Sequence, residues 1–157
     1  MLHLIPASLH RAALRIAHRL RQVWRRTVKL PRAGVSLVAL DTQGRVLLVR
    51  HSYGSGRWGL PGGALGWRED PSAGARRELR EELGCEAEQL TLVATIEERL
   101  WGAPHTAFVF GLRLIGQPRP DGREVIEAGF FPPHALPGSI GPISRRRIEA
   151  WREHARP

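Results

Sequence analysis

The sequence predicts one α/β domain in which helices pack against a mixed β-sheet, preceded by an extra amphipathic helix. A length of 157 residues fits a single domain with a sizeable core. Strand-like and helical segments are mixed along the chain, and the second and third expected strands flank a helix, as in an α/β sandwich. No stretch approaches 18 consecutive apolar residues, so we expect no transmembrane helix. The lone Cys85 excludes an internal disulfide and argues against a cysteine-ligated zinc site.

Residues 1–30 form a basic segment that we separate from the domain expected over residues 31–157. Over residues 9–26, apolar and basic side chains fall on opposite sides of a helix. Residues 1–32 hold eight cations and no Asp or Glu, which accounts for nearly all of the net charge of +9. Any binding to a polyanion would therefore depend on this helix.

Several partners fit this N-terminal helix. Its apolar side could pack on the domain or on a second subunit in a homodimer. Its basic side could contact RNA or an anionic membrane surface, and Trp24 suits the membrane interface. An arginine-rich segment without acids also fits an organelle-targeting signal, but the use of Arg over Lys through the whole chain, 23 against 1, is typical of a GC-rich bacterial genome and argues against it. We expect a cytoplasmic protein, peripheral to the membrane if this helix binds lipid.

The domain opens with two β-rich runs, Gly34–Asp41 and Arg45–His51, and Thr42-Gln43-Gly44 between them predicts a hairpin. Glycine and proline predict a loop over residues 51–66. A helix should then run from residue 71 to 83, because an Asp-Pro pair precedes it and a glycine follows it. Four further elements follow: strands over Leu90–Leu100, Thr106–Ile115 and Gly129–Phe131, and a final helix over Ile143–His154.

The helix over residues 71–83 carries a cluster of like charges. Glu78, Glu81 and Glu82 stand at i, i+3 and i+4, so their side chains share one face. Such a cluster is destabilising by itself, but a hard cation reverses the sign, because Mg²⁺ binds carboxylates, water and substrate phosphates. Leu79 and Leu83 should anchor the helix to the core and leave the carboxylates toward the glycine-rich loop.

The spacing around this cluster is more specific than the cluster itself. A solvated helix face would explain the acidic run, but it would not explain the residues upstream. The chain satisfies the pattern G-x5-E-x7-R-E-U-x-E-E-x-G-U, where U is a bulky apolar residue, at Gly63, Glu69, Arg77, Glu78, Leu79, Glu81, Glu82, Gly84 and Cys85. With this pattern, called the Nudix box, the chain resembles the Nudix hydrolase family from about Pro31 to Pro137. Cys85 stands where the family usually has an aliphatic residue, and cysteine is a small hydrophobe.

The resemblance implies an α/β/α sandwich that holds a divalent cation, Mg²⁺ or alternatively Mn²⁺, against a pyrophosphate. It implies that Glu78 and Glu82 are the main metal ligands, and that the carbonyl of Gly62 or Gly63 also reaches the metal. Glu81 would be a further ligand or would orient the attacking water. Two residues, Glu69 and Arg77, would fix the loop to the helix, with Arg77 counted among the catalytic groups. The cation would acidify a water for in-line attack on phosphorus.

Residues outside the box complete the expected site. Family members that use an additional base place it about six residues before an aromatic pair, here Phe130-Phe131, which favours Glu124 over the nearby Glu127. Four residues are candidates for contacts to the substrate: Arg57, Trp58, Trp101 and His105. Trp58 equally fits a packing role, and the run Arg145–Arg147 is expected to be a solvated helix face.

The resemblance implies hydrolysis of a pyrophosphate bond in a nucleoside diphosphate linked to another group, with a nucleotide-like small molecule as substrate. The alternative is a module of the same fold that binds nucleotides without turnover. The complete set of box glutamates favours the enzyme. Triphosphates, dinucleotides, nucleotide sugars and capped RNA ends all remain open as substrates.

Overall fold

The computed structural model describes residues 32–100 and 102–155, together with residues 13, 16 and 17. The helix expected over residues 9–26 therefore lies almost entirely outside the described residues, and so does Trp101. No helix in the described part of the chain is long and apolar enough to cross a membrane.

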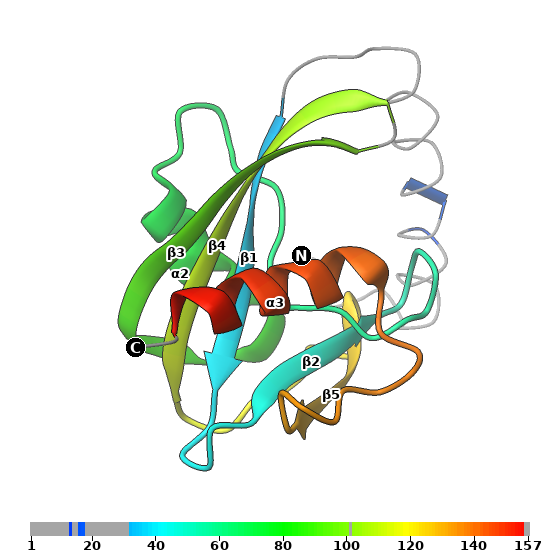
Figure 1. Ribbon diagram of the computed structural model, residues 1–157. Helices are drawn as coiled ribbons and strands as arrows, with labels where there is room; N and C mark the ends of the chain where they lie inside the picture. The colour runs from blue at the N-terminus through cyan, green and yellow to red at the C-terminus, as the bar shows by residue number, and fades with distance from the viewer. Residues whose placement is uncertain (1–12, 14–15, 18–31, 101, 156–157) are drawn as a thin grey trace.

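The domain is built on a five-stranded sheet in the order β3-β4-β1-β2-β5 (Figure 1). The strands are β1 (Arg32–Leu40), β2 (Val46–His51), β3 (Glu86–Leu100), β4 (Ala103–Ile115) and β5 (Val125–Phe131). β1 pairs with β4 in parallel, and the other three neighbouring pairs are antiparallel. The sheet is therefore mixed, as the sequence predicts.

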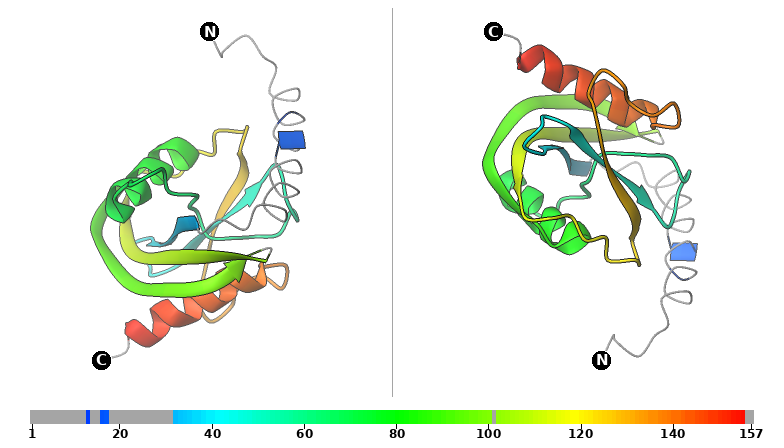
Figure 2. Two further views of the ribbon diagram at one scale, coloured as in Figure 1. Left: turned by 90° about the horizontal axis from the view of Figure 1, so that it is seen from above. Right: turned by 90° about the horizontal axis from the view of Figure 1, so that it is seen from below.

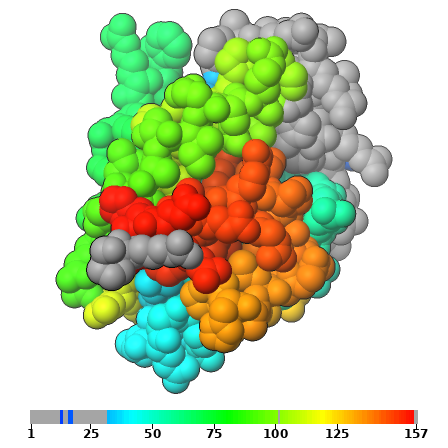
Figure 3. All heavy atoms as spheres, viewed as in Figure 1, coloured from blue at the N-terminus to red at the C-terminus, as the bar shows by residue number. Residues whose placement is uncertain are grey.

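Two helices, α2 (Pro71–Leu83) and α3 (Pro142–His154), lie on opposite faces of this sheet (Figure 2). Leu79 and Leu83 of α2 are fully buried in a core that includes Leu37 and Leu47. Ile148 of α3 is fully buried in a second core, and α3 itself lies across the face seen in Figure 3. The predicted α/β/α sandwich is thus confirmed, with the two cores separated by the sheet.

The start and end of α2 follow the signals in the sequence. Asp70 caps the helix by accepting a hydrogen bond from the N–H of Ala73, and Pro71 occupies the first turn, where no N–H is needed. Gly84 ends the helix in the left-handed region at φ 62°, where a residue without Cβ meets no steric penalty. The helix is therefore fixed in register by its own sequence.

The glycine-rich loop is inserted between two strands of the sheet. β1 and β2 pair directly at Leu40 and Val46, beside the hairpin turn. Beyond that point the loop takes the place of a strand: Val35 N–H donates to the Gly63 carbonyl and Val49 exchanges two hydrogen bonds with Gly59. The backbone of the loop is consequently held by the same kind of hydrogen bonds as a strand, next to the carboxylates of α2.

Several elements are longer than their sequences predict. β3 begins at Glu86 instead of Leu90, and β5 begins at Val125 instead of Gly129. The extension of β3 contains two glutamates and a glutamine, and that of β5 sets the fully buried Val125 beside the exposed Ile126. Neither sequence indicates a strand by itself, but both pair with neighbours: Glu86 with Ile115 and Val125 with His51. Likewise, α3 starts one residue early at Pro142, and the expected turn residues Ala103 and Pro104 belong to β4.

Candidate active site

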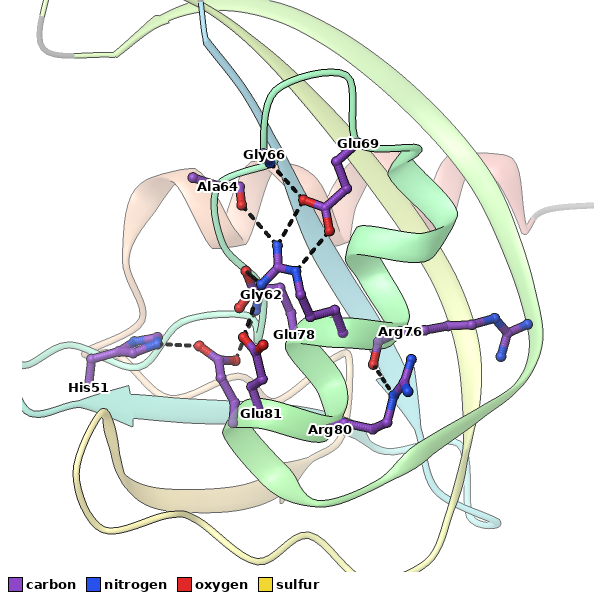
Figure 4. Close-up of polar contacts among 11 residues, drawn as sticks. His51, Gly62, Ala64, Gly66, Glu69, Arg76, Glu78, Arg80 and Glu81 are labelled. Atoms are coloured by element: carbon purple, nitrogen blue, oxygen red, sulfur yellow. Dashed lines mark hydrogen bonds and ion pairs between the residues drawn. The ribbon is translucent and has the colours of Figure 1, made fainter. Parts of the chain in front are cut away.

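Arg77 joins α2 to the glycine-rich loop. Its Nε and Nη2 donate to the two carboxylate oxygens of Glu69 at 2.8 and 3.0 Å, and Nη2 also donates to the Ala64 carbonyl at 3.2 Å (Figure 4). The hydrogen bonds from Arg77, with one from the Gly66 N–H, lower the pKa of Glu69 to about 2. Glu69 thus remains ionised, and the two residues lie where the resemblance places them, between the loop and the helix.

Two carboxylates of the box share the same guanidinium. Arg77 Nη1 lies 2.8 Å from Glu78 Oε1 and 3.0 Å from Glu81 Oε2. The side chain of Glu78 is only 12% exposed, whereas that of Glu81 is 60% exposed. Burial raises the pKa of Glu78 to about 6, and the charges of Glu82 and Glu81 add to the rise while Arg77 opposes it. Glu78 is therefore a buried carboxylate with incomplete charge compensation.

Glu82 is the most buried member of the cluster, with 4% of its surface exposed. Its Oε2 accepts a hydrogen bond from the Gly62 N–H at 3.1 Å, and its Oε1 lies 2.9 Å from His51 Nε2. Burial lowers the pKa of His51, but the hydrogen bond and charge of Glu82 outweigh it and raise the pKa above its ordinary value. The sequence interpretation missed this contact, because nothing in the local pattern at the end of β2 indicates a partner on α2.

The two glycines that contact this cluster tolerate no side chain. Gly62 has φ +136°, and a Cβ there would collide with the Val35 carbonyl. A Cβ on Gly63 would lie 2.5 Å from Glu78 Oε1. The carboxylate of Glu78 therefore packs directly on the loop backbone, which is possible only because position 63 carries no Cβ.

The donor set fits a hard divalent cation. Buried carboxylate oxygens of Glu78 and Glu82 and the Gly63 carbonyl are the oxygen ligands that Mg²⁺ binds. Among residues 32–100 and 102–155, however, no three His, Cys, Asp or Glu side chains converge tightly enough to hold a metal by themselves. The contacts explain this, since Arg77 holds two of the carboxylates and His51 holds the third. Mg²⁺ needs only one or two carboxylates when water and phosphates complete its shell.

The two candidates for the additional base lie in different surroundings. The Glu124 carbonyl accepts a hydrogen bond from the Ser52 N–H at 2.8 Å, and the Glu124 charge raises the pKa of His51. Glu127 instead pairs with Arg50 at 3.0 Å, and the Arg50 guanidinium lies over the ring of Trp58 in the core under α3. Glu124 therefore lies near the box carboxylates, and Glu127 lies on the opposite face of the sheet.

The expected substrate contacts are distributed over two adjoining cavities. His105 lines a cavity of about 300 Å³, and Arg57 and Trp58 line a second one of about 540 Å³. Trp58 also packs edge-on against Phe131, with ring centroids 5.0 Å apart, so it has a structural role in the core. The contact expected at Trp101 lies outside the described residues. Contacts to substrate at the other three positions stay predictions.

The expectation that Arg145–Arg147 is a solvated helix face is wrong for Arg147. Its side chain is 12% exposed, and its guanidinium contacts Glu98 and donates to Ser36 Oγ at 2.6 Å. Helical periodicity indicates this position, because Arg147 lies one turn before the half-buried Trp151 and beside Ile148. When the three arginines are considered as one charged run, the buried position of Arg147 cannot be distinguished from its two exposed neighbours.

Several known proteins are similar to this chain in sequence or in fold. An ADP-ribose pyrophosphatase of Mycobacterium tuberculosis is 33% identical over 106 residues, which are 62% of this chain and 51% of the relative. An RNA pyrophosphohydrolase of Teredinibacter turnerae is 33% identical over 66 residues, 42% of this chain and 39% of the relative. The chain thus spans about half or less of these curated relatives. The crystal structure of a MutT NUDIX hydrolase from Burkholderia pseudomallei superposes with a TM-score of 0.70 at 29% identity, covering 77% of this chain and 98% of that one.

A family model for the NUDIX domain matches residues 30–151, which include the whole sheet, α2, most of α3 and every box residue. This range covers well over half of the 157 residues. The carboxylate cluster on α2, its glycine-rich cradle and the matched range lead to one conclusion. The chain belongs to the NUDIX domain family.

Proposed function

We propose that this protein hydrolyses a pyrophosphate bond in a nucleoside diphosphate derivative and requires Mg²⁺ or Mn²⁺ to do so. The observation that carries the proposal is the burial of two like-charged side chains, Glu78 and Glu82, against the backbone of Gly62 and Gly63. Buried carboxylates that repel each other are costly unless a cation joins them. The pyrophosphatase names of the two curated relatives support the same class of reaction.

The residues of the chain would divide the work as follows. Glu78, Glu82 and the Gly63 carbonyl would hold the cation, with Glu81 as a more exposed further ligand. When bound, the cation would neutralise phosphoryl charge and make water more acidic. Arg77 and Glu69 would keep the loop and α2 in register, because their paired hydrogen bonds fix both carboxylate oxygens of Glu69. The buried surroundings of Glu82 would strengthen every electrostatic contact at the site.

Glu124 would accept the proton of the attacking water. Three N–H groups, those of Arg123, Glu124 and Val125, donate to the Asp121 carboxylate and hold the turn before β5 in place. The proximity of the Glu124 charge to His51 supports a position beside the box carboxylates. The pairing of Glu127 with Arg50 makes it the weaker candidate.

The test is a phosphate-release screen over nucleoside triphosphates, dinucleotide diphosphates, nucleotide sugars and capped RNA, with Mg²⁺ and with EDTA. We expect hydrolysis of at least one compound with Mg²⁺ and none with EDTA. In Glu82→Gln the rate should fall about 100-fold or more, the scale of losing one well-placed electrostatic group. The melting temperature should change little, because the substitution opens no cavity in the core.

Glu88→Gln is the matched control, since it makes the same chemical change at an exposed position of β3. It should keep the rate of the parent protein. Wild-type rates in Glu82→Gln, or no hydrolysis of any diphosphate compound by the parent, would reject the proposal. The second result, combined with tight nucleotide binding, would favour the module that binds without turnover.

A further inference from the structure

The cavity of about 300 Å³ adjoins the residues that cradle the carboxylates. Its lining includes Gly62, Gly63 and His51, each of which contacts Glu78 or Glu82. Apolar residues form other parts of the wall, among them Leu60 and Pro104. A mostly apolar cavity with a few polar groups is the usual form of a small-molecule site, and this volume is at the lower end of the range for such sites.

One polar part of the wall is Arg147, which is held in a buried ion pair, and Arg32, Tyr53, His105 and Ser144 also line the cavity. Arg147 contacts Glu98 and donates to Ser36, and the Glu98 side chain is 9% exposed. Glu98 Oε1 also lies 3.4 Å from His105 Nδ1, and Glu98 Oε2 lies 3.4 Å from Arg146 Nη2. Because Glu98 offsets the charge of Arg147, the pair attracts anions weakly. It can still select a ligand through the direction in which its N–H groups donate hydrogen bonds. We therefore expect it to recognise a neutral polar edge and not a phosphate.

This part of the wall offers hydrogen-bond donors. A guanidinium has five N–H donors and no acceptor. Arg147 uses Nη1 for Ser36 and Nη2 for Glu98, and its Nε has no hydrogen-bond partner among the described residues. Ser36 Oγ accepts from Arg147, so its own proton is directed elsewhere. The carboxylate of Glu98 is contacted by Arg146 and Arg147, and His105 Nδ1 lies 3.4 Å from it.

We propose that this cavity receives the base of the substrate, and that Arg147 and Ser36 select bases with a carbonyl oxygen over bases with an amino group in its place. The inference rests on the proposed function and names its substrate class: nucleotides of guanine, hypoxanthine, uracil or thymine. Guanine presents O6 and N7 as two acceptors that an arginine binds together, whereas adenine presents an N6 amino donor. An amino group facing Arg147 would leave buried donors unpaired, which costs free energy. Glu98 acts as a positioning residue, because it holds the guanidinium through the ion pair.

The experiment compares two nucleotides that differ only at this atom. IMP carries a carbonyl and AMP an amino group at position 6 of the purine. We expect calorimetric titration in EDTA, without metal or turnover, to give IMP and GMP dissociation constants roughly 10- to 100-fold lower than that of AMP. Steady-state kinetics with Mg²⁺ should give the same order for kcat/KM of ITP and GTP against ATP.

Substitutions test whether the preference for IMP over AMP depends on Arg147 and Ser36. Arg147→Met should reduce the IMP preference to within about threefold of unity, because the guanidinium donors are lost while an unbranched side chain remains. Arg145→Met is the matched control, an exposed arginine of the same helix, and should keep the parent preference. If Arg147→Met fails to fold by circular dichroism, Ser36→Ala serves instead, since it keeps the ion pair, and should lower the preference several-fold.

The outcomes separate this inference from the proposed function. Equal binding of IMP and AMP by the parent, or an unchanged preference in folded Arg147→Met, overturns the inference. Displacement of IMP by inorganic phosphate at the same concentration as by GMP also overturns it, because the cavity would then be a phosphate site. Selective IMP binding without hydrolysis of any compound supports the inference and rejects the proposed function. Hydrolysis of ITP and ATP with equal kcat/KM supports the proposed function and rejects the inference.

Discussion

The helices α2 and α3 are equally long but bury opposite charges. Each has 13 residues with proline in the first turn, and each anchors one face of the same sheet. α2 buries the carboxylate of Glu82 beside the carboxylates of Glu78 and Glu81. α3 buries the guanidinium of Arg147 beside the carboxylate of Glu98.

The difference lies in how each buried charge is compensated. On α3 the compensation is internal, because Arg147 and Glu98 neutralise each other within hydrogen-bonding contact. On α2 one guanidinium is shared by Glu69, Glu78 and Glu81, while Glu82 has His51 and a backbone N–H. Burial and mutual repulsion raise the pKa of Glu78 to about 6, so this cluster holds more negative charge than its surroundings balance. An uncompensated cluster favours binding of an added cation, whereas a compensated pair favours the positioning of hydrogen bonds.

The first prediction concerns how the two helices are anchored to the sheet, and its effect should be the largest. Leu79 and Ile148 are fully buried in the two cores. Alanine at either position should lower the free energy of unfolding by about 3 kcal/mol, as deletions of buried aliphatic groups do. Because the sheet separates the two cores, the double variant should lose the sum. Urea denaturation followed by circular dichroism measures both. A loss below about 1 kcal/mol for one helix would mean that the two helices are not anchored alike.

The second prediction contrasts the two arginines and rests on the hydrolytic activity. Arg77→Lys keeps a positive charge but cannot bind both oxygens of Glu69 at once. We expect kcat/KM to fall about 100-fold for every accepted substrate, as a small misplacement of a catalytic group does. The ratio of ITP to ATP should not change, in contrast to Arg147→Met. Arg80→Lys, an exposed position of α2, is the control and should retain parent kinetics. If Arg77→Lys changed the ratio of kcat/KM for ITP to that for ATP, the role of Arg77 in the reaction would not be separate from the selection of the base.

The third prediction concerns acid stability and should be the smallest effect. The pKa of Glu69 is about 2 in the folded protein, against an ordinary value of 4.5. A carboxyl group with a lowered pKa stabilises the folded state above the ordinary value, and this contribution is lost as the pH falls toward 2. The melting temperature of the parent should therefore exceed that of Glu69→Gln at pH 5 and above, and the difference should shrink toward pH 2. A difference that stays constant over this range would show that the Arg77 pair does not control it. Glu88→Gln should show no such trend.

The sequence alone was sufficient to predict α2 and the carboxylates that share one of its faces. Asp70, Pro71 and Gly84 fix where the helix starts and ends through local hydrogen bonds and backbone preferences, and the structure has each as expected. The spacing of Glu78, Glu81 and Glu82 places them on one face by helical geometry. These features depend on residues within a few turns of one another, so they can be deduced from the chain without its fold.

Only the tertiary structure decided which distant groups meet. The pairing of β1 with β4 in parallel, and the insertion of the Gly59–Gly63 segment between β1 and β2, bring together residues far apart in sequence. Glu82 meets His51 across 31 positions, and Arg147 meets Glu98 across 49. A local pattern cannot reveal such partners, because burial and charge compensation depend on how the elements pack and not on the spacing of residues within them.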